Sequence, residues 1–265
     1  MRLLHLGIAI ITVGLLTTEH VRVVGDVDRM NTVFKVTYQL WVWVGLLIPM
    51  LIYGLLQQRR YLFALGSVVL LATGLLFPFQ AIPARYDDNH SGDYTLDGSR
   101  FMDVMTLEQN GWRLHTARDA ALARYMRANL PGTPTIAEFY QREYWWNSRI
   151  SVLTGFPSVI GWANHMRQQY SHLHPEIEQR QNDIRLLYSA TDAATILNIL
   201  RRYQIDYVVV GELERSMMPP RTLDLFYQLR DTGQLTLVYD ALFTELFRVE
   251  HAQLEDGNRL VSQRE

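Results

Sequence analysis

The chain has 265 residues, a formal net charge of -2 and a hydrophobic fraction of 48%. So little net charge gives no bulk electrostatic reason to bind nucleic acid. No cysteine is present, which excludes disulfides, thiolate metal sites and cysteine nucleophiles. The first 81 residues are almost continuously apolar, whereas the rest has the composition of a water-soluble domain.

Residues 3–17 (LLHLGIAIITVGLLT) form the first apolar run. About 15 residues are short for a membrane span and would also suit the core of a signal peptide after Arg2. The residues that follow, TEHVRVV, contain no small-x-small cleavage site. We therefore interpret this run as a membrane span.

Two longer runs follow, at residues 33–56 and 61–81, and Lys35 is the only formal charge within them. At about 1.5 Å per residue, each is long enough to cross a hydrocarbon core of about 30 Å. The link QQRR, with Arg59 and Arg60, joins them into a helical hairpin. The positive-inside rule places this link in the cytoplasm and both outer ends on the extracytoplasmic side.

From Pro83 onward the sequence has the pattern of an α/β domain, entered through a polar loop at 85–94 (RYDDNHSGDY). β-branched runs and their breakers predict strands at 134–139, 205–211, 235–240 and 245–250. Apolar spacing predicts helices at 117–129, 176–188, 192–203 and 221–231, the third with an N-cap at Thr191 or Asp192. This order of elements implies a partly parallel sheet. The predicted architecture is a polytopic α-helical membrane region of about three spans (1–82) and a small extracytoplasmic α/β domain (83–265).

No standard catalytic signature is present: G-x-S-x-G, H-E-x-x-H and glycine-rich phosphate loops are all missing from the sequence. His165, His172 and His174 lie close together, but their spacing fits no metal motif, and a solvated loop explains them more simply. Two other stretches are more informative.

The first stretch is the charged loop from Glu19 to Lys35, at the mouth of the second span. Carboxylates at a membrane surface bind divalent cations, and arginine or lysine binds phosphate, so together they suit a lipid-linked phosphosugar. The alternative is an ordinary polar loop in which Lys35 extends toward the headgroups. The polar residues of this loop are Glu19, His20, Arg22, Asp26, Asp28, Arg29, Asn31 and Lys35.

The second stretch, residues 139–165, combines aromatic side chains with arginines. Such a combination is typical of sugar binding or of anchoring to lipid headgroups. Alternatively, its tryptophans belong to the core or dock the domain onto its own membrane helices; the sequence leaves both open. Its members are Tyr140, Arg142, Tyr144, Trp145, Trp146, Arg149 and Trp162.

Five segments in register resemble the C-terminal part of the YYY membrane proteins, large polytopic proteins of archaea and chloroflexi. They are DRMNTVFKVTYQLW (28–41), TLDGSRFM (95–102), RISVLTGFPSVIGWANH (149–165), QRQNDIRLLY (179–188) and YQIDYVVVGELER (203–215). Because members of that family are longer, the resemblance implies that this chain is a C-terminal piece or starts at an internal methionine.

The YYY family in turn resembles the glycosyltransferase C superfamily, which includes protein mannosyltransferases and oligosaccharyltransferases. That resemblance implies inverting transfer of a sugar from a polyprenyl-phosphate carrier, with a catalytic base in a loop upstream of Met1. The residues that match the family's acidic-RMNT-FK segment are Glu19, Asp26, Arg29, Asn31 and Lys35.

The chain also departs from its relatives in two places. It has Ala163-Asn164-His165-Met166 where the YYY family more often has a His-Glu pair. Trp145-Trp146-Asn147 is similar to the oligosaccharyltransferase tryptophan motif but lacks the Asp-Tyr-Gly that follows there.

The leading hypothesis is therefore the C-terminal part of a glycosyltransferase-like membrane protein, whose partners are membrane lipid, a polyprenyl-phosphate sugar donor and upstream spans of the same protein. Glu19 and Asp26 would hold a divalent cation, Mg²⁺ or Mn²⁺. The remaining candidates would bind lipid phosphate or sugar. They are Arg29, Asn31, Lys35, Arg142, Trp145, Trp146, Arg149, Trp162 and His165. The alternative hypothesis is a non-catalytic membrane-anchored binding or assembly module.

Overall fold

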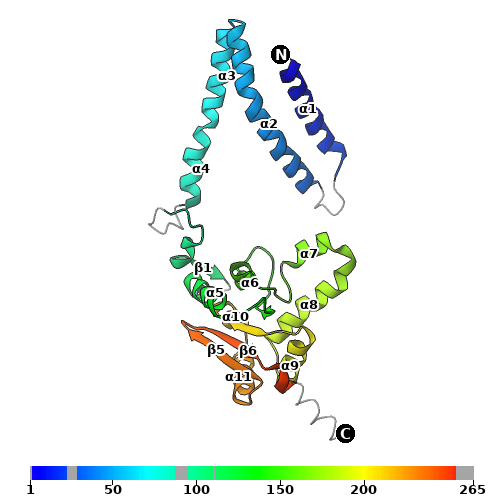
Figure 1. The fold of residues 1–265 in the computed structure, drawn as a ribbon, viewed down its shortest axis with the longest axis vertical. Coiled ribbons are helices and arrows are strands. Elements are labelled where there is room, and N and C mark those ends of the chain that lie inside the picture. Colours follow the sequence, from blue (N-terminus) through cyan, green and yellow to red (C-terminus); the bar gives the residue numbers. More distant parts are fainter. Residues whose placement is uncertain (1, 23–28, 87–94, 110, 255–265) are drawn as a thin grey trace. The chain divides into compact units, whose positions relative to one another are not determined.

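The structure is a computed structural model that describes residues 2–22, 29–86, 95–109 and 111–254 (Figure 1). It divides into two compact units, residues 1–88 and 89–265. Residues 87–94 of the predicted loop lie outside the described part of the chain.

The first unit consists of long apolar helices. They are α1 (Arg2–His20), α2 (Met30–Gln57), α3 (Tyr61–Gly74) and α4 (Leu76–Tyr86). Within the described residues, three segments are long and apolar enough to cross a membrane: Leu3–His20, Met30–Gln57 and Tyr61–Ala84. This confirms the three predicted spans and supports a multi-pass membrane protein.

The first span is longer than its apolar run. The hydroxyl of Thr17 donates to the carbonyl of Val13 at 2.7 Å, and that of Thr18 donates to Leu15 at 2.8 Å. Because these polar side chains bond to carbonyls of their own helix, α1 continues past the apolar run to His20.

Two glycines on α1 allow it to pack closely against α2. A Cβ atom built on Gly7 would lie 2.5 Å from Leu47, and one built on Gly14 would lie 2.9 Å from Leu40. Both pairs are seven residues apart along their helices, which is the spacing of one packing stripe. Small residues are the usual way in which membrane helices approach each other.

The second unit is built around a four-stranded sheet of order β3-β4-β6-β5. Its strands are β3 (Ile136–Ala137), β4 (Tyr207–Val210), β5 (Leu235–Ala241) and β6 (Thr244–Val249). β3 and β4 pair in parallel, whereas β6 pairs antiparallel with both β4 and β5. The predicted α/β domain with a partly parallel sheet is therefore confirmed.

Helices of this unit cover both faces of the sheet. They are α5 (Thr116–Asn129), α6 (Arg149–Thr154), α7 (Ala163–Gln169), α8 (His174–Leu187), α9 (Ala193–Arg202), α10 (Glu212–Met217) and α11 (Pro220–Asp231). Asp192 caps α9, since its carboxylate accepts from the backbone N–H of Thr195 at 2.8 Å. The predicted N-cap is therefore Asp192 of the pair.

The strands place alternate side chains into two separate cores. Val208, Val210 and Phe247 face the larger core, which α8, α9 and α11 complete. Val209 and Leu246 face the smaller core, which α5 and α6 complete. The domain is therefore a three-layer structure, and burial on both faces explains why β4 is continuously apolar.

The sequence pattern did not reveal one hairpin and three short helices. The hairpin joins β1 (Thr106–Gln109) and β2 (Trp112–His115) in the stretch between the last span and α5. The short helices are α6, α7 and α10, each of seven residues or fewer. Helices this short carry too few apolar repeats to be detected by periodicity.

Replacing Gly14 with isoleucine should separate α1 from α2, because the added side chain would overlap Leu40. Overpacking of this kind costs about 1–3 kcal/mol. We expect a lower melting temperature for the helices of the full chain in detergent micelles, measured by circular dichroism at 222 nm. Gly45→Ile in α2 is the matched control, since a Cβ there meets no described atom within 4 Å. Equal melting temperatures for both variants would contradict the packing.

Candidate functional site

The membrane-side candidate site lies where α1 ends and α2 begins. The Arg29 guanidinium bonds to the Glu19 carboxylate at 2.7 Å and to the Glu19 carbonyl at 3.0 Å. Asn31 and Lys35 follow in the first turns of α2, with Lys35 exposed. The structure therefore brings together Glu19 and Arg29, whereas Asp26 lies outside the described residues.

A groove along α2 begins at Arg29. It has a volume of about 580 Å³ and is lined by Arg29, Met30, Val33, Phe34, Thr37 and Tyr38. The rings of Phe34 and Tyr38 meet edge to face, with centroids 4.7 Å apart. A mainly apolar groove with a cation at one end has the chemistry to hold an amphiphile with an anionic head.

Glu19 and Asp26 were the predicted metal ligands. Over residues 2–22, 29–86, 95–109 and 111–254, no group of three or more histidine, aspartate or glutamate side chains is arranged to hold a metal ion. The divalent-cation site therefore stays a prediction.

The second candidate site is an open groove in the α/β domain. It has a volume of about 320 Å³ and is lined by Leu107, Glu108, Tyr144, Trp145 and Trp146. We call it the aromatic groove. Its volume is at the lower end of the ~300–1,000 Å³ range of small-molecule sites. The β1–β2 hairpin supplies one wall, and the segment before α6 supplies the aromatic wall.

Three rings contact one another at the aromatic groove: Tyr144, which lines it, and Trp162 and His165 beside it. The ring centroids of Tyr144 and Trp162 are 4.9 Å apart, and those of Trp162 and His165 are 5.4 Å apart. Tyr144 is 73% exposed and has a positive φ of 62°. A left-handed backbone is costly for a bulky residue. The backbone conformation of Tyr144 is therefore imposed by the surrounding structure and not by its own φ/ψ preference.

Arg142 stacks on the other aromatic residue of the groove wall. Its guanidinium carbon lies 3.6 Å from the centroid of a Trp145 ring, which is a close cation–π contact. Of the predicted ligand residues of this stretch, Arg142, Trp145, Trp162 and His165 are therefore gathered at or beside the aromatic groove.

Glu143 links two segments of this surface by hydrogen bonds. Its carboxylate accepts from the Tyr140 hydroxyl at 2.8 Å and from the Asn164 backbone N–H at 2.7 Å. Partial burial opposes ionisation, but these hydrogen bonds outweigh it and lower the pKa of Glu143. Burial and the neighbouring Glu143 raise the pKa of Tyr140 to about 12, so its hydroxyl stays a donor.

Arg149 lies inside the domain and not at the groove. Its side chain is 1% exposed and forms ion pairs with Asp119 at 2.9 Å and Glu214 at 2.7 Å. Glu138 is a third carboxylate, 3.7 Å from the same guanidinium. We call these four residues the buried ion cluster. Because its guanidinium is buried among three carboxylates, Arg149 does not line the groove, and its role as a ligand residue stays a prediction.

Trp146 connects the buried ion cluster to the aromatic groove. Its indole N–H donates to the Asp119 carboxylate at 2.6 Å, while its ring lines the groove. A carboxylate locked by Arg149 therefore fixes the orientation of this ring, so Trp146 shapes the groove wall from a partly buried position.

The three carboxylates of the cluster have different environments. Burial raises the pKa of Glu138 to about 7, against the lowering effects of Arg149 and of the N–H groups of Ser151 and Ile150. Burial also raises the pKa of Asp119. For Glu214, Arg149 outweighs burial and lowers the pKa. Glu214 is thus ionised, and its carboxylate accepts from both terminal nitrogens of the Arg149 guanidinium, at 2.7 and 3.0 Å.

Gly211, at the end of β4, leaves room for this arrangement. A Cβ atom there would lie 3.0 Å from an Arg149 nitrogen and 3.2 Å from a Glu214 oxygen. The Gly211 N–H donates to the same Glu214 carboxylate at 2.9 Å. A side chain at this position would therefore push against the most tightly bonded pair of the cluster.

No family model matches the chain, and no curated protein is significantly similar to it. The resemblance to the YYY membrane proteins is therefore not confirmed. Among solved structures, the C-terminal globular domain of an oligosaccharyltransferase from Archaeoglobus fulgidus is similar, with 14% identity and a TM-score of 0.32. The match covers 55% of this chain and 100% of that one. A likeness this distant does not determine the activity of the chain.

The raised pKa of Glu138 predicts that the domain loses stability as the pH rises. Between about pH 4.5 and 7 the unfolded chain releases this proton while the folded domain keeps it, so the free energy of unfolding falls. The fall amounts to about 3 kcal/mol and levels off above pH 7. Urea unfolding of the full chain in detergent, followed by near-ultraviolet circular dichroism, measures it.

Glu138→Gln should flatten this pH dependence, because glutamine does not titrate. A residual fall of the same sign is expected from Asp119, whose pKa is also raised. Glu178→Gln, at an exposed position on α8, is the matched control and should keep the wild-type slope. The same slope in both variants would contradict the assignment to Glu138.

Proposed function

We propose that this chain is the C-terminal part of a glycosyltransferase-like membrane protein and that the aromatic groove binds a saccharide. The observation that carries the proposal is the composition of this groove, which Tyr144, Trp145 and Glu108 line together. Apolar faces of a sugar ring pack on aromatic rings, and its hydroxyls donate to carboxylates.

The edge-to-face contacts of the Tyr144 ring with Trp162 and His165 support a preorganised binding surface. Trp162 and His165 support the ring from one side, and the His165 Nε2 lies 3.4 Å from the Tyr144 hydroxyl. A ligand that meets rings already held in position loses less entropy on binding. Docking of these aromatic residues onto the membrane helices is the competing explanation, and a saccharide titration separates the two.

The sugar donor in this proposal is attached to a lipid phosphate. The groove along α2 supports it, because an apolar tail fits Met30, Val33 and Phe34 while Arg29 lies at the end of the groove. The Glu19 carboxylate occupies one side of the Arg29 guanidinium, so a phosphate would replace or share that contact. Asn31 and Lys35 lie in the same helical turns as further candidate phosphate contacts.

Two further elements of the proposal come from chemistry and topology. A divalent cation, Mg²⁺ or Mn²⁺, would neutralise charge between Glu19, Asp26 and the donor phosphate. Arg59 and Arg60, between α2 and α3, favour a cytoplasmic link. That orientation would place the start of α2 and the α/β domain on the extracytoplasmic side of the cell membrane.

The test is saccharide binding by the full chain in lipid nanodiscs, measured by tryptophan fluorescence with neutral di- and trisaccharides. Tyr144→Ala and Trp145→Ala should each weaken binding about tenfold, or about 1.4 kcal/mol, since each removes an aromatic wall of the groove. Tyr170→Ala is the matched control, because Tyr170 is exposed but does not line the groove. No saccharide binding, or an equal effect of all three variants, would refute the saccharide site.

A donor-binding assay separates the enzyme from its alternative. The nanodisc-embedded chain is given a radiolabelled polyprenyl-phosphate sugar, and binding, not transfer, is measured, because the resemblance puts the catalytic base upstream of Met1. Binding that Arg29→Ala abolishes would support the lipid-linked donor. Saccharide binding at the aromatic groove without binding of the lipid-linked donor would favour the non-catalytic membrane-anchored binding module.

A further inference from the structure

Arg142 differs from most other arginines of the α/β domain in its partners. Many of those arginines are paired with a carboxylate, for example Arg202 with Asp183 and Arg215 with Glu245. Of the carboxylates that the structure describes, none bonds to the guanidinium of Arg142, whose contact is the Trp145 ring. Because the Arg142 side chain is exposed, its N–H groups are accessible to a ligand.

The backbone at Arg142 is anchored. The buried Asn147 side chain donates from its amide to the Arg142 carbonyl. Between them, Tyr144 has the left-handed φ of 62°, and Ser148 follows with 56°. This tight loop, stacked on Trp145, presents the guanidinium in a fixed place and at low entropic cost.

The charge already present in the aromatic groove is balanced. Glu108 lies directly opposite Arg113 across the β1–β2 hairpin, with their charged groups 3.5 Å apart. The groove thus has a paired anion at its hairpin wall. Arg142, which contacts the lining residue Trp145, is a neighbouring cation that is not paired to any described carboxylate. A neutral sugar would leave the charge of Arg142 without a partner.

We propose that the aromatic groove selects a saccharide that bears an anionic group, with Arg142 as the anion-binding residue. This inference rests on the proposed saccharide site and specifies its ligand. The sugar ring packs on the exposed Tyr144 side of the groove, and the carboxylate or phosphate of the sugar accepts two hydrogen bonds from the guanidinium fork. The cation–π contact with Trp145, itself a lining residue of the groove, holds the guanidinium next to the bound sugar.

The experiment compares three ligands on the full chain in nanodiscs of zwitterionic lipid. They are a neutral disaccharide, the matching disaccharide with one uronic acid, and a hexose phosphate; tryptophan fluorescence gives each dissociation constant. At least one of the two anionic ligands should bind about ten times more tightly than the neutral one at low salt. The uronate and phosphate arms identify which anion is preferred.

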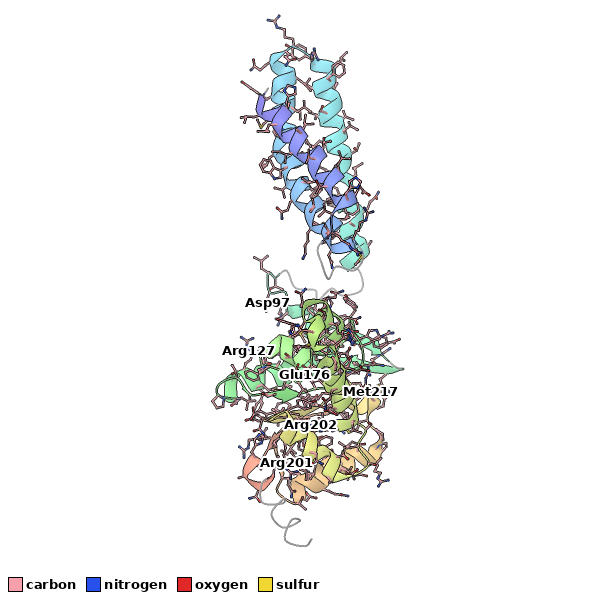
Figure 2. The ribbon with its side chains drawn as sticks, turned by 90° about the vertical axis from the view of Figure 1, so that its right-hand side faces the viewer. Asp97, Arg127, Glu176, Arg201, Arg202 and Met217 are labelled. Atoms are coloured by element: carbon pink, nitrogen blue, oxygen red, sulfur yellow. The ribbon has the colours of Figure 1, made fainter. Side chains whose placement is uncertain are left out.

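Arg142→Gln should remove this preference, so that anionic and neutral sugars bind with equal affinity, and Arg142→Lys should restore only part of the preference. Arg127→Gln is the matched control, because Arg127 is an exposed arginine in the last turn of α5 (Figure 2). Near-ultraviolet circular dichroism identical to wild type shows that each variant is folded.

Equal binding of neutral and anionic ligands, or a preference that survives Arg142→Gln, would overturn the inference and leave the saccharide site intact. A loss of preference in Arg127→Gln as well would also overturn it, since it would reflect the overall charge. Failure of every saccharide to bind the wild type would instead refute the proposed saccharide site itself.

Discussion

The guanidinium of Arg149, surrounded by Asp119, Glu138 and Glu214, is the interaction on which the α/β domain depends. These residues come from α5, the segment after β3, the start of α6 and α10, so one buried cation links four separate parts of the chain. A buried charge without its partner typically costs about 3–5 kcal/mol. Backbone hydrogen bonds stabilise two of its carboxylates: the N–H groups of Ile150 and Ser151 donate to Glu138, and those of Phe139 and Gly211 donate to Glu214.

The same cluster determines the shape of the domain surface. Asp119 shares its carboxylate between Arg149 and the indole N–H of Trp146. Trp146 lines the aromatic groove, so the interior of the domain positions one of its walls. The exposed Tyr144 and the half-buried Trp145 line the groove beside this fixed neighbour. This explains how a loop with two left-handed residues presents a defined binding surface.

Long apolar runs and β-branched segments in the sequence predict most of the membrane helices and most of the sheet. The three apolar runs and the strands at β4, β5 and β6 are long or β-branched enough to be predicted with their order. The β1–β2 hairpin is not among the predicted elements although Asn110-Gly111 is a strong short hairpin signal, because strands of only four residues carry little alternation. Without that hairpin, Leu107 and Glu108 could not be placed opposite the tryptophans.

The buried ion cluster was missed for a different reason. Asp119 occupies the same helical stripe as Leu122, Ala123 and Met126, all buried, and an acid on an apolar stripe indicates a buried charge. Its partner Arg149 lies thirty positions away, however, and no spacing rule connects two residues brought together only by tertiary packing. Arg149 was therefore assigned to the ligand site with its exposed neighbours, whereas its charge belongs to the interior.

The bond between Trp146 and Asp119 joins the buried ion cluster to the aromatic groove, and hydrogen exchange of the tryptophan indoles tests it most directly. By NMR of the full chain in detergent, the indole N–H of Trp146 should exchange at least about tenfold more slowly than that of Trp112, which is 48% exposed. In Asp119→Leu this protection should disappear. Equal exchange rates for the two indoles in the wild type would contradict the claim that the buried ion cluster holds the groove in place.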